Sequence, residues 1–116
     1  MTDSKIIEIF KILGNPNRLK LFDILMTGVH CNCELSELTG LAMNLISHHL
    51  KVLQEAELIQ SDRSTTDGRW IYYSINEETL AIIKPILDKF FDSNRIVDRE
   101  PSCPPCKQKS KENNNE

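Results

Sequence analysis

Residues 44–59 read NLISHHLKVLQEAELI and predict one helix with two different faces. Ile46, Leu50 and Leu53 recur at the spacing of a single helical face, so we expect them to be buried. On this pattern the helix extends from about residue 43 to residue 57. The opposite face carries small or hydrogen-bonding side chains, which belong to Asn44, Ser47, His48 and Lys51.

A shorter helix is expected just before this one, over residues 34–39, with Leu35 and Leu38 on one side. Gly40 is suited to the left-handed position that ends a helix. Two helices joined by a tight turn that contains glycine are typical of a helix-turn-helix motif. The second helix would begin after Ala42, which lacks the side-chain oxygen of a Ser or Thr cap and so forgoes about 1 kcal/mol of capping.

The chain after this motif predicts a β-hairpin and one more helix. Residues 58–75 hold two β-prone segments around a turn-rich stretch, and Asp67-Gly68 within it is a strong reversal signal. Residues 77–92 return to helical spacing. Pro85 lies inside that segment and should kink the helix or occupy an early position in it.

Two further helices are expected ahead of the helix-turn-helix. The first should follow a cap at Asp3 or Ser4. Its apolar residues are Ile6, Ile9, Phe10 and Leu13. The second should begin at Pro16 with Asn15 as its cap. Its apolar stripe consists of Leu19, Phe22, Leu25 and Met26. The whole order is helix, helix, helix-turn-helix, hairpin, helix, which predicts a winged helix-turn-helix: a mainly α fold with a β-hairpin (α+β).

The 116 residues of the chain suit one domain with a tail. Residues 1–93 hold all the expected helices and strands. Residues 94–116 turn polar and rich in proline, cannot bury enough apolar area to hold a shape, and should form a flexible tail. No run approaches the roughly 18 apolar residues of a membrane span, and the N-terminus lacks the features of a secretory signal. We expect a cytoplasmic protein with no membrane partner.

The formal net charge of −3 argues weakly against nucleic acid, so DNA binding would need a local basic face. The motif and the hairpin offer a polar face, but residues 44–75 hold three Lys or Arg against four acids, so the electrostatic grip per subunit should be modest. Asn and Ser can address base edges in a major groove, His can reach a base or a phosphate, and Lys or Arg can pair with the backbone. The alternative is an ordinary solvated surface. The candidate DNA-binding residues are Asn44, Ser47, His48, Lys51, Arg63 and Arg69.

The four cysteines come in two close pairs, Cys31 with Cys33 and Cys103 with Cys106. In a cytosolic chain they should stay reduced, which favours metal ligands or redox centres over a disulfide framework. Side chains two positions apart point about 200° from each other on a helix but the same way in an extended segment. If the first pair chelates one ion, the start of the short helix must therefore be unwound, either permanently or upon binding.

Residues 13–25 (LGNPNRLKLFDIL), together with residues 44–59 and 68–75 (GRWIYYSI), resemble the ArsR/SmtB family of metal-sensing repressors. The similarity covers roughly residues 5 to 92. It implies a homodimer that places two reading helices on successive turns of a palindromic operator. It also implies that the first and last helices form the dimer interface; the alternative is that they complete the monomer core. The aromatic residues concerned are Phe10, Phe90 and Phe91.

The resemblance points to the arsenic-sensing branch, whose Cys-x-Cys-acid-Leu motif appears here from Cys31 to Leu35. In that branch a further cysteine commonly follows at the position of Ser36, so the motif is incomplete. The tail is the expected source of the missing sulfur, from Cys103 with or without Cys106. Trivalent metalloids favour three thiolates, whereas cadmium, lead or zinc would accept four sulfur ligands. A zinc or nickel site on the last helix has no support, because residues 77–92 contain no His.

These observations predict a repressor that needs no cofactor to bind operator DNA and is released when As(III) or Sb(III) binds its thiolates. One alternative is a Cd(II)- or Pb(II)-responsive repressor, and another is a repressor of the same fold that senses thiol oxidation or persulfide. A thiol-disulfide enzyme built on CPPC at residues 103–106 is disfavoured, because the motif lacks its usual α/β context. The protein is therefore not expected to be an enzyme. His30 is a possible nitrogen ligand, and His49 should pack or contact a phosphate.

Overall fold

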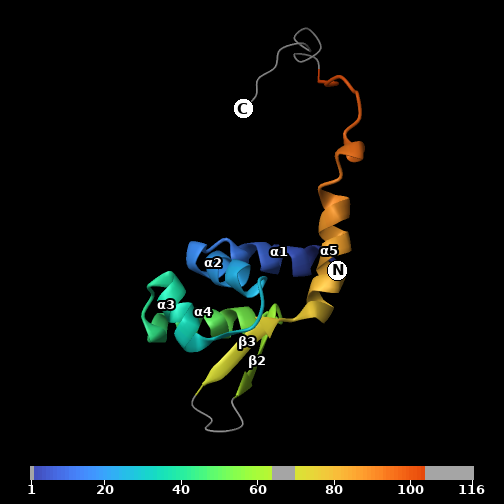
Figure 1. The fold of residues 1–116 in the computed structure, drawn as a ribbon. Coiled ribbons are helices and arrows are strands. Elements are labelled where there is room, and N and C mark those ends of the chain that lie inside the picture. The colour runs from blue at the N-terminus through green and yellow to red at the C-terminus, as the bar shows by residue number, and fades with distance from the viewer. Residues whose placement is uncertain (1, 64–69, 104–116) are drawn as a thin grey trace.

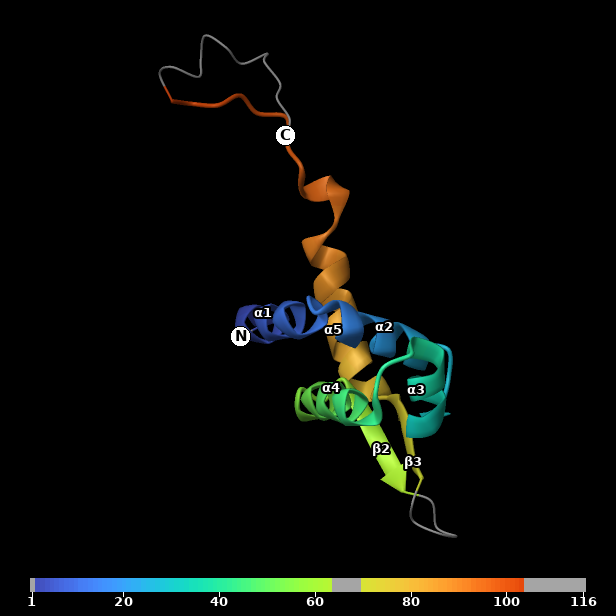
Figure 2. The same cartoon turned by 90° about the vertical axis from the view of Figure 1, so that its left-hand side faces the viewer.

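The computed structural model describes residues 2–63 and 70–103. These residues form α1 (Thr2–Leu13), α2 (Pro16–Leu25), β1 (His30–Cys31), α3 (Asn32–Thr39), α4 (Met43–Glu55), β2 (Ile59–Arg63), β3 (Ile71–Ile75), α5 (Glu77–Phe90) and a 3-10 turn (Ser93–Arg95). Figures 1 and 2 show α1 to α4 as one body, with the β2–β3 hairpin projecting from one end and α5 rising from the other. The expected winged helix-turn-helix fold is confirmed.

The sheet has three antiparallel strands in the order β1-β3-β2. β2 and β3 form the expected hairpin, with Ile59 opposite Ile75 and Arg63 opposite Ile71. The reversal predicted at Asp67-Gly68 lies outside the described residues. β1 was not expected: its two residues pair with β3 on the side away from β2. So short a strand has no alternating pattern that a sequence could reveal.

The core lies between α2, α3, α4 and the base of the sheet, and Ile6 and Ile9 of α1 and Ile83 of α5 also pack into it. Its largest fully buried side chains are Leu21, Leu25, Leu35, Ile46, Leu50, Leu53 and Ile59. The buried face predicted for α4 is thus confirmed in full. The stripe predicted for α2 is partly wrong, because Leu19 and Met26 are exposed while Leu21 is fully buried. Apolar residues lie on two sides of this helix, and its packing against α4 decides which side faces inward.

Several predicted helix ends shift by one or two residues. α1 begins at Thr2, so Asp3 and Ser4 lie inside its first turn instead of capping it. α2 does begin at Pro16, with Asn15 as its cap. α4 ends at Glu55, ahead of the predicted residue 57, because Glu57 adopts a left-handed conformation with φ of 65°. A residue other than glycine gives no sequence signal for such a stop.

α5 ends at Phe90, and Pro85 lies well inside it instead of early in it. Ile83 packs into the core, but Phe10, Phe90 and Phe91 are 44%, 53% and 68% exposed. The alternative in which these rings complete the monomer core is therefore wrong. Beyond the 3-10 turn, residues 96–103 form neither helix nor strand and are exposed. The division of the chain at residue 93 stays a prediction.

Candidate nucleic-acid interface and thiol site

The turn between α3 and α4 is held by hydrogen bonds that side chains supply. Gly40 is left-handed at φ of 75° and donates its N–H to the Ser36 carbonyl. The Ser36 hydroxyl donates to the Leu41 carbonyl at 2.8 Å, and the Leu41 N–H donates to the Thr39 hydroxyl at 3.1 Å. Ser36 occupies the position at which the arsenic-sensing branch commonly has a further cysteine. Here its hydroxyl bond helps to set the angle between α3 and α4.

The outward face of α4 is polar and open. Ala42 is the N-cap with extended backbone and makes no side-chain capping bond, as the sequence predicted. The apolar side of the helix is anchored in the core, so its other side is held in a fixed orientation. The four candidate residues on that other side are all exposed: Asn44, Ser47, His48 and Lys51.

His49 belongs to the interior, unlike its neighbour His48. Its side chain is only 6% exposed, and its Nδ1 has no hydrogen-bond partner among the described residues. Burial lowers the pKa of His49 below its ordinary value, and the positive charges of Arg18 and His48 lower the pKa further. His49 is therefore a neutral packing residue, and the alternative of a phosphate contact is not supported.

The hairpin contributes one described candidate, Arg63, which is exposed at the end of β2 opposite Ile71. Arg69 lies outside the described residues. On the neighbouring strand, burial raises the pKa of the Tyr73 hydroxyl, and the charge of Arg63 opposes part of that rise. Within the hairpin, Tyr73 is thus buried, while the Arg63 side chain at the described end of β2 is exposed to solvent.

Cys31 and Cys33 meet where β1 joins α3. Cys31 is the N-cap of α3 with φ of −85° and ψ of 162°, whereas Cys33 lies in the first helical turn. Because only one of the two is helical, their side chains converge: the sulfurs are joined in a disulfide and the Cα atoms are 5.4 Å apart. α3 begins at Asn32, two residues earlier than predicted, and its first turn remains helical while the sulfurs touch.

Two neighbours of the thiol pair have structural partners. The Glu34 carboxylate accepts the backbone N–H of Cys31 at 2.9 Å, so the acid of the motif acts as a capping group. His30 donates from Nδ1 to the Gly28 carbonyl at 2.8 Å. A donated Nδ1–H leaves Nε2 as the imidazole nitrogen with an available lone pair. His30 thus stays a possible ligand, but among the described residues it is not grouped with the two sulfurs as a third donor.

The structure does not bring Cys103 of the tail to this pair. Figures 1 and 2 show residues 96–103 leading away from the body beyond the far end of α5. Among the described residues, no three Cys, His, Asp or Glu side chains are grouped as a metal would need. Cys103 lies in this extended segment, and Cys106 lies outside the described residues. The site on α3 therefore has two of the expected sulfurs in place.

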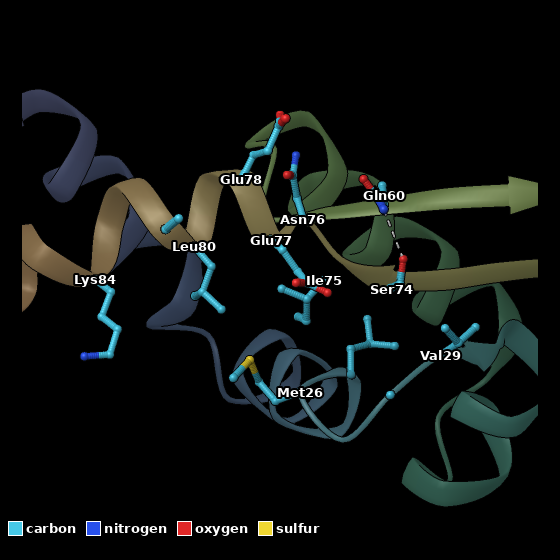
Figure 3. Close-up of a pocket in the computed structure, with 13 residues that line it drawn as sticks. Met26, Val29, Gln60, Ser74, Ile75, Asn76, Glu77, Glu78, Leu80 and Lys84 are labelled. Atoms are coloured by element: carbon cyan, nitrogen blue, oxygen red, sulfur yellow. Dashed lines mark hydrogen bonds between the residues drawn. The ribbon is translucent and has the colours of Figure 1, made fainter.

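A hollow of about 950 Å³ opens on another side of the molecule, between the end of α2, β3 and the start of α5. Figure 3 shows Met26 and Leu80 across it from one another, with Glu77 and Glu78 at the start of α5. None of the residues that line it is Cys or His. Its lining therefore differs in chemistry from the thiol pair, although Gly28 and Val29 lie just ahead of β1 in the chain.

Comparison with known proteins agrees with this architecture. The family model for bacterial regulatory proteins of the arsR family matches residues 15–61. An arsenical resistance operon repressor from Staphylococcus xylosus is 33% identical over 88 residues, which are 76% of this chain and 82% of that protein. The chain belongs to the arsR family. The family predicted from the sequence is confirmed.

Other members of the arsR family are similar over less of their length or at lower identity. The arsenical resistance operon repressor of Bacillus subtilis is 36% identical over 70 residues, and this chain spans 64% of its length. A homodimeric winged helix-turn-helix domain from Mycobacterium bovis superimposes with a TM-score of 0.59 at 22% identity, covering 82% of this chain and 89% of that one. That second likeness supports the fold alone. Within the described residues, no helix has the length and apolar character needed to cross a bilayer.

Proposed function

We propose that this arsR-family protein is a metalloid-responsive transcriptional repressor, which binds operator DNA as a homodimer and is released when As(III) or Sb(III) binds its thiolates. The observation that carries the proposal is the convergence of Cys31 and Cys33 at the N-cap of α3. A ligand held there acts on the helix that positions the DNA-reading helix α4. The relatives named arsenical resistance operon repressors support the choice of inducer.

DNA recognition is assigned to α4 and the hairpin. The exposed face of α4 fits a major groove, where its amide and hydroxyl groups address base edges and Lys51 pairs with a phosphate. Arg63, at the described end of β2, places a cation where the adjoining backbone or minor groove can be reached, and Arg69, which lies outside the described residues, is the second proposed contact. With so few cations per subunit, two copies are needed for a firm electrostatic grip.

The homodimer is assigned to α1 and α5. These two helices expose a set of large apolar side chains that a solvated monomer would not favour: Ile7, Phe10, Ile82, Phe90 and Phe91. A second copy would bury them and set two α4 helices side by side, as a palindromic site requires. The homodimeric relative from Mycobacterium bovis has the same fold.

The inducer chemistry is ligand exchange without a change of oxidation state. Reduced Cys31 and Cys33 each replace a hydroxide of arsenous acid; an As–S bond forms, an As–O bond breaks, and the thiol proton leaves with the hydroxide as water. A third exchange completes the trigonal site that a soft metalloid favours. Ser36 cannot supply that sulfur, so the proposed donor is Cys103, with Cys106 as a further tail thiol. Cd(II) or Pb(II) would use four sulfurs.

Operator binding by the reduced protein, followed by fluorescence anisotropy with and without arsenite, tests this proposal. Couplings of this kind are typically about 1 to 3 kcal/mol, so arsenite should weaken the affinity by about 5-fold to 150-fold. Cys31→Ser should bind the operator normally and lose the response. If Cys31→Ser is released like the wild type, the proposal is wrong.

Two further variants locate the third sulfur. Cys103→Ser and Cys106→Ser, made singly, show which tail thiol is required for release. Ser36→Cys places a third sulfur on α3 itself and should restore the response of a tail variant that has lost it. A tail variant that responds normally would restrict the site to the two thiols of α3 and leave the tail without a role in it.

A redox switch is a second candidate, because Cys31 and Cys33 form a disulfide in this structure. An oxidant such as hydrogen peroxide would take two electrons and two protons from the thiol pair and be reduced to water. The two functions differ in what the released protein carries. Inductively coupled plasma mass spectrometry, with thiol counting after the metalloid is removed by a chelator, should find arsenic and the full number of thiols in the first case. In the second case it should find no metal and two thiols fewer.

A further inference from the structure

Cys31 belongs to two elements of the fold at once. It is the last residue of β1 and the N-cap of α3, and its backbone N–H is held by the Glu34 carboxylate. A group that binds the Cys31 sulfur therefore acts on a residue with two attachments. One attachment leads through α3 and the turn at Gly40 to α4, and the other leads into the sheet.

The attachment to the sheet consists of two opposed residue pairs. His30 is opposite Tyr73 and Cys31 is opposite Tyr72. In an antiparallel ladder, pairs that exchange both N–H···O=C bonds alternate with pairs that exchange none. The Cys31 N–H is given to Glu34, so the bonded pair is His30 with Tyr73. β1 has only two residues, so the His30–Tyr73 pair is a large part of its attachment to the sheet.

β3 passes this attachment on to the hairpin. It lies between β1 and β2, and Tyr73 faces His30 on one side and Ser61 on the other. The Tyr73 side chain is buried in the core, so β3 cannot shift at this point without moving packed neighbours. A displacement of β1 should therefore displace β3 and, through it, β2, which ends at Arg63.

We infer that the His30–Tyr73 pair couples the thiol site to the hairpin, so that a soft metalloid or metal bound at Cys31 changes the β2–β3 hairpin as well as α4. His30 and Tyr73 are positioning residues in this scheme, acting through their backbone. The effect on DNA rests on the proposed function. The coupling itself is a property of the free protein and is measured without DNA.

Hydrogen–deuterium exchange of the full chain, reduced and then loaded with arsenite, tests the coupling. Loading should change the exchange rate of amides in residues 71–75 and 59–63 by about threefold or more, because the pairing of β1 is disturbed. Cys31→Ser should show no such change. Exchange that changes in α3 and α4 while both strands stay unaffected would overturn the inference.

A matched pair of variants at residue 30 separates the backbone from the side chain. His30→Pro removes the N–H of the bonded pair, and His30→Ala keeps it while removing the imidazole. Both should bind arsenite, as mass spectrometry of the loaded protein will report. Only His30→Pro should lose the exchange response of residues 71–75. Loss of the response in His30→Ala as well would assign His30 a ligand role and refute the backbone route.

Oxidation of Cys31 and Cys33 from dithiol to disulfide is a second way to perturb the His30–Tyr73 pair. Comparing the two forms requires neither metal nor a variant. If neither arsenite nor oxidation alters the exchange of residues 71–75, the inference is wrong. If exchange in the hairpin responds but operator affinity does not, the coupling holds and the proposed function fails. The two failures are thus distinguishable.

Discussion

Helices α4 and α5 have nearly equal lengths, 13 and 14 residues, and both carry an apolar stripe. The chain itself covers the stripe of α4, where Leu50 is 1% exposed. It leaves much of α5 uncovered, including Phe90 at its end. Apolar periodicity thus shows that a helix has a partner, but not whether that partner lies in the same chain. Here the apolar stripe of α4 packs into the monomer core, and the exposed apolar stripe of α5 suits contact with another copy of the chain.

The strongest test of this contrast is a cavity on the covered side. Leu50→Ala should lower the free energy of unfolding by about 2 to 5 kcal/mol, because it removes fully buried methyl groups of α4. Leu45→Ala, on the same helix but 38% exposed, should change it by less than about 0.5 kcal/mol. Urea denaturation measures both. Similar losses for the two variants would mean that α4 packs differently from this description.

On the exposed face at the end of α5, Phe91→Asp should weaken the proposed dimer and leave the stability of the monomer fold unchanged. A buried interface aromatic contributes about 2 kcal/mol or more, so the dimer dissociation constant should rise by about 30-fold. Leu19→Asp changes a residue on α2 that is 51% exposed, against 68% for Phe91, and should leave the dimer intact. Sedimentation velocity over a concentration series distinguishes the two. Equal dimerisation of both variants would exclude the end of α5 from the interface.

A third change acts on the point where α4 ends. Glu57 holds a left-handed conformation that costs a residue with a Cβ roughly 1 to 2 kcal/mol. Glycine removes that cost but loses more chain entropy on folding, so Glu57→Gly should stabilise the protein by about 0.5 to 1 kcal/mol. The midpoint of thermal unfolding should rise. A fall would show that the Glu57 side chain makes a stabilising interaction that outweighs its backbone strain.

The exposed faces of the two helices should differ toward DNA. Lys51→Ala on α4 should reduce the slope of log affinity against log salt by about 0.9 for each phosphate that the side chain neutralises. Lys84 is equally cationic but lies on α5, where it pairs with Asp88 at 2.8 Å on the surface, so Lys84→Ala should leave the slope unchanged. Operator titrations at several salt concentrations give both slopes. A larger effect at Lys84 would mean that the DNA binds to a face other than that of α4.

The smallest expected effect concerns pH and the buried side of α4. Burial, with the charges of Arg18 and His48, holds the pKa of His49 below its ordinary value of 6.5. The unfolded chain therefore takes up this proton first, and the stability that neutral His49 provides is lost as the pH falls below 6.5. Urea midpoints between about pH 7.5 and about pH 5.5 should fall less in His49→Gln than in the wild type. The matched variant His48→Gln removes one of the smaller causes and should retain most of the wild-type dependence, because burial is the largest cause.

Much of the candidate site was predictable because its signals are local. The buried and exposed faces of α4, the uncapped start at Ala42 and the stop at Gly40 all follow from residues a few positions apart. The pairing of the thiols was also visible as a close spacing. The early start of α3 was not predictable. Glu34 caps this helix by accepting the Cys31 N–H, but nothing in the sequence distinguishes it from any other acidic residue.

The amino-acid sequence by itself determined the order of the five helices and the hairpin, the inner face of α4 and the close spacing of Cys31 and Cys33, since each depends on neighbouring residues. Only the tertiary structure decided which side of α2 is buried, that His49 lies inside, and that β1 attaches Cys31 to β3. Those outcomes depend on segments that are distant in the chain. Their energies come from packing and backbone pairing between elements, and no local pattern records which elements will meet.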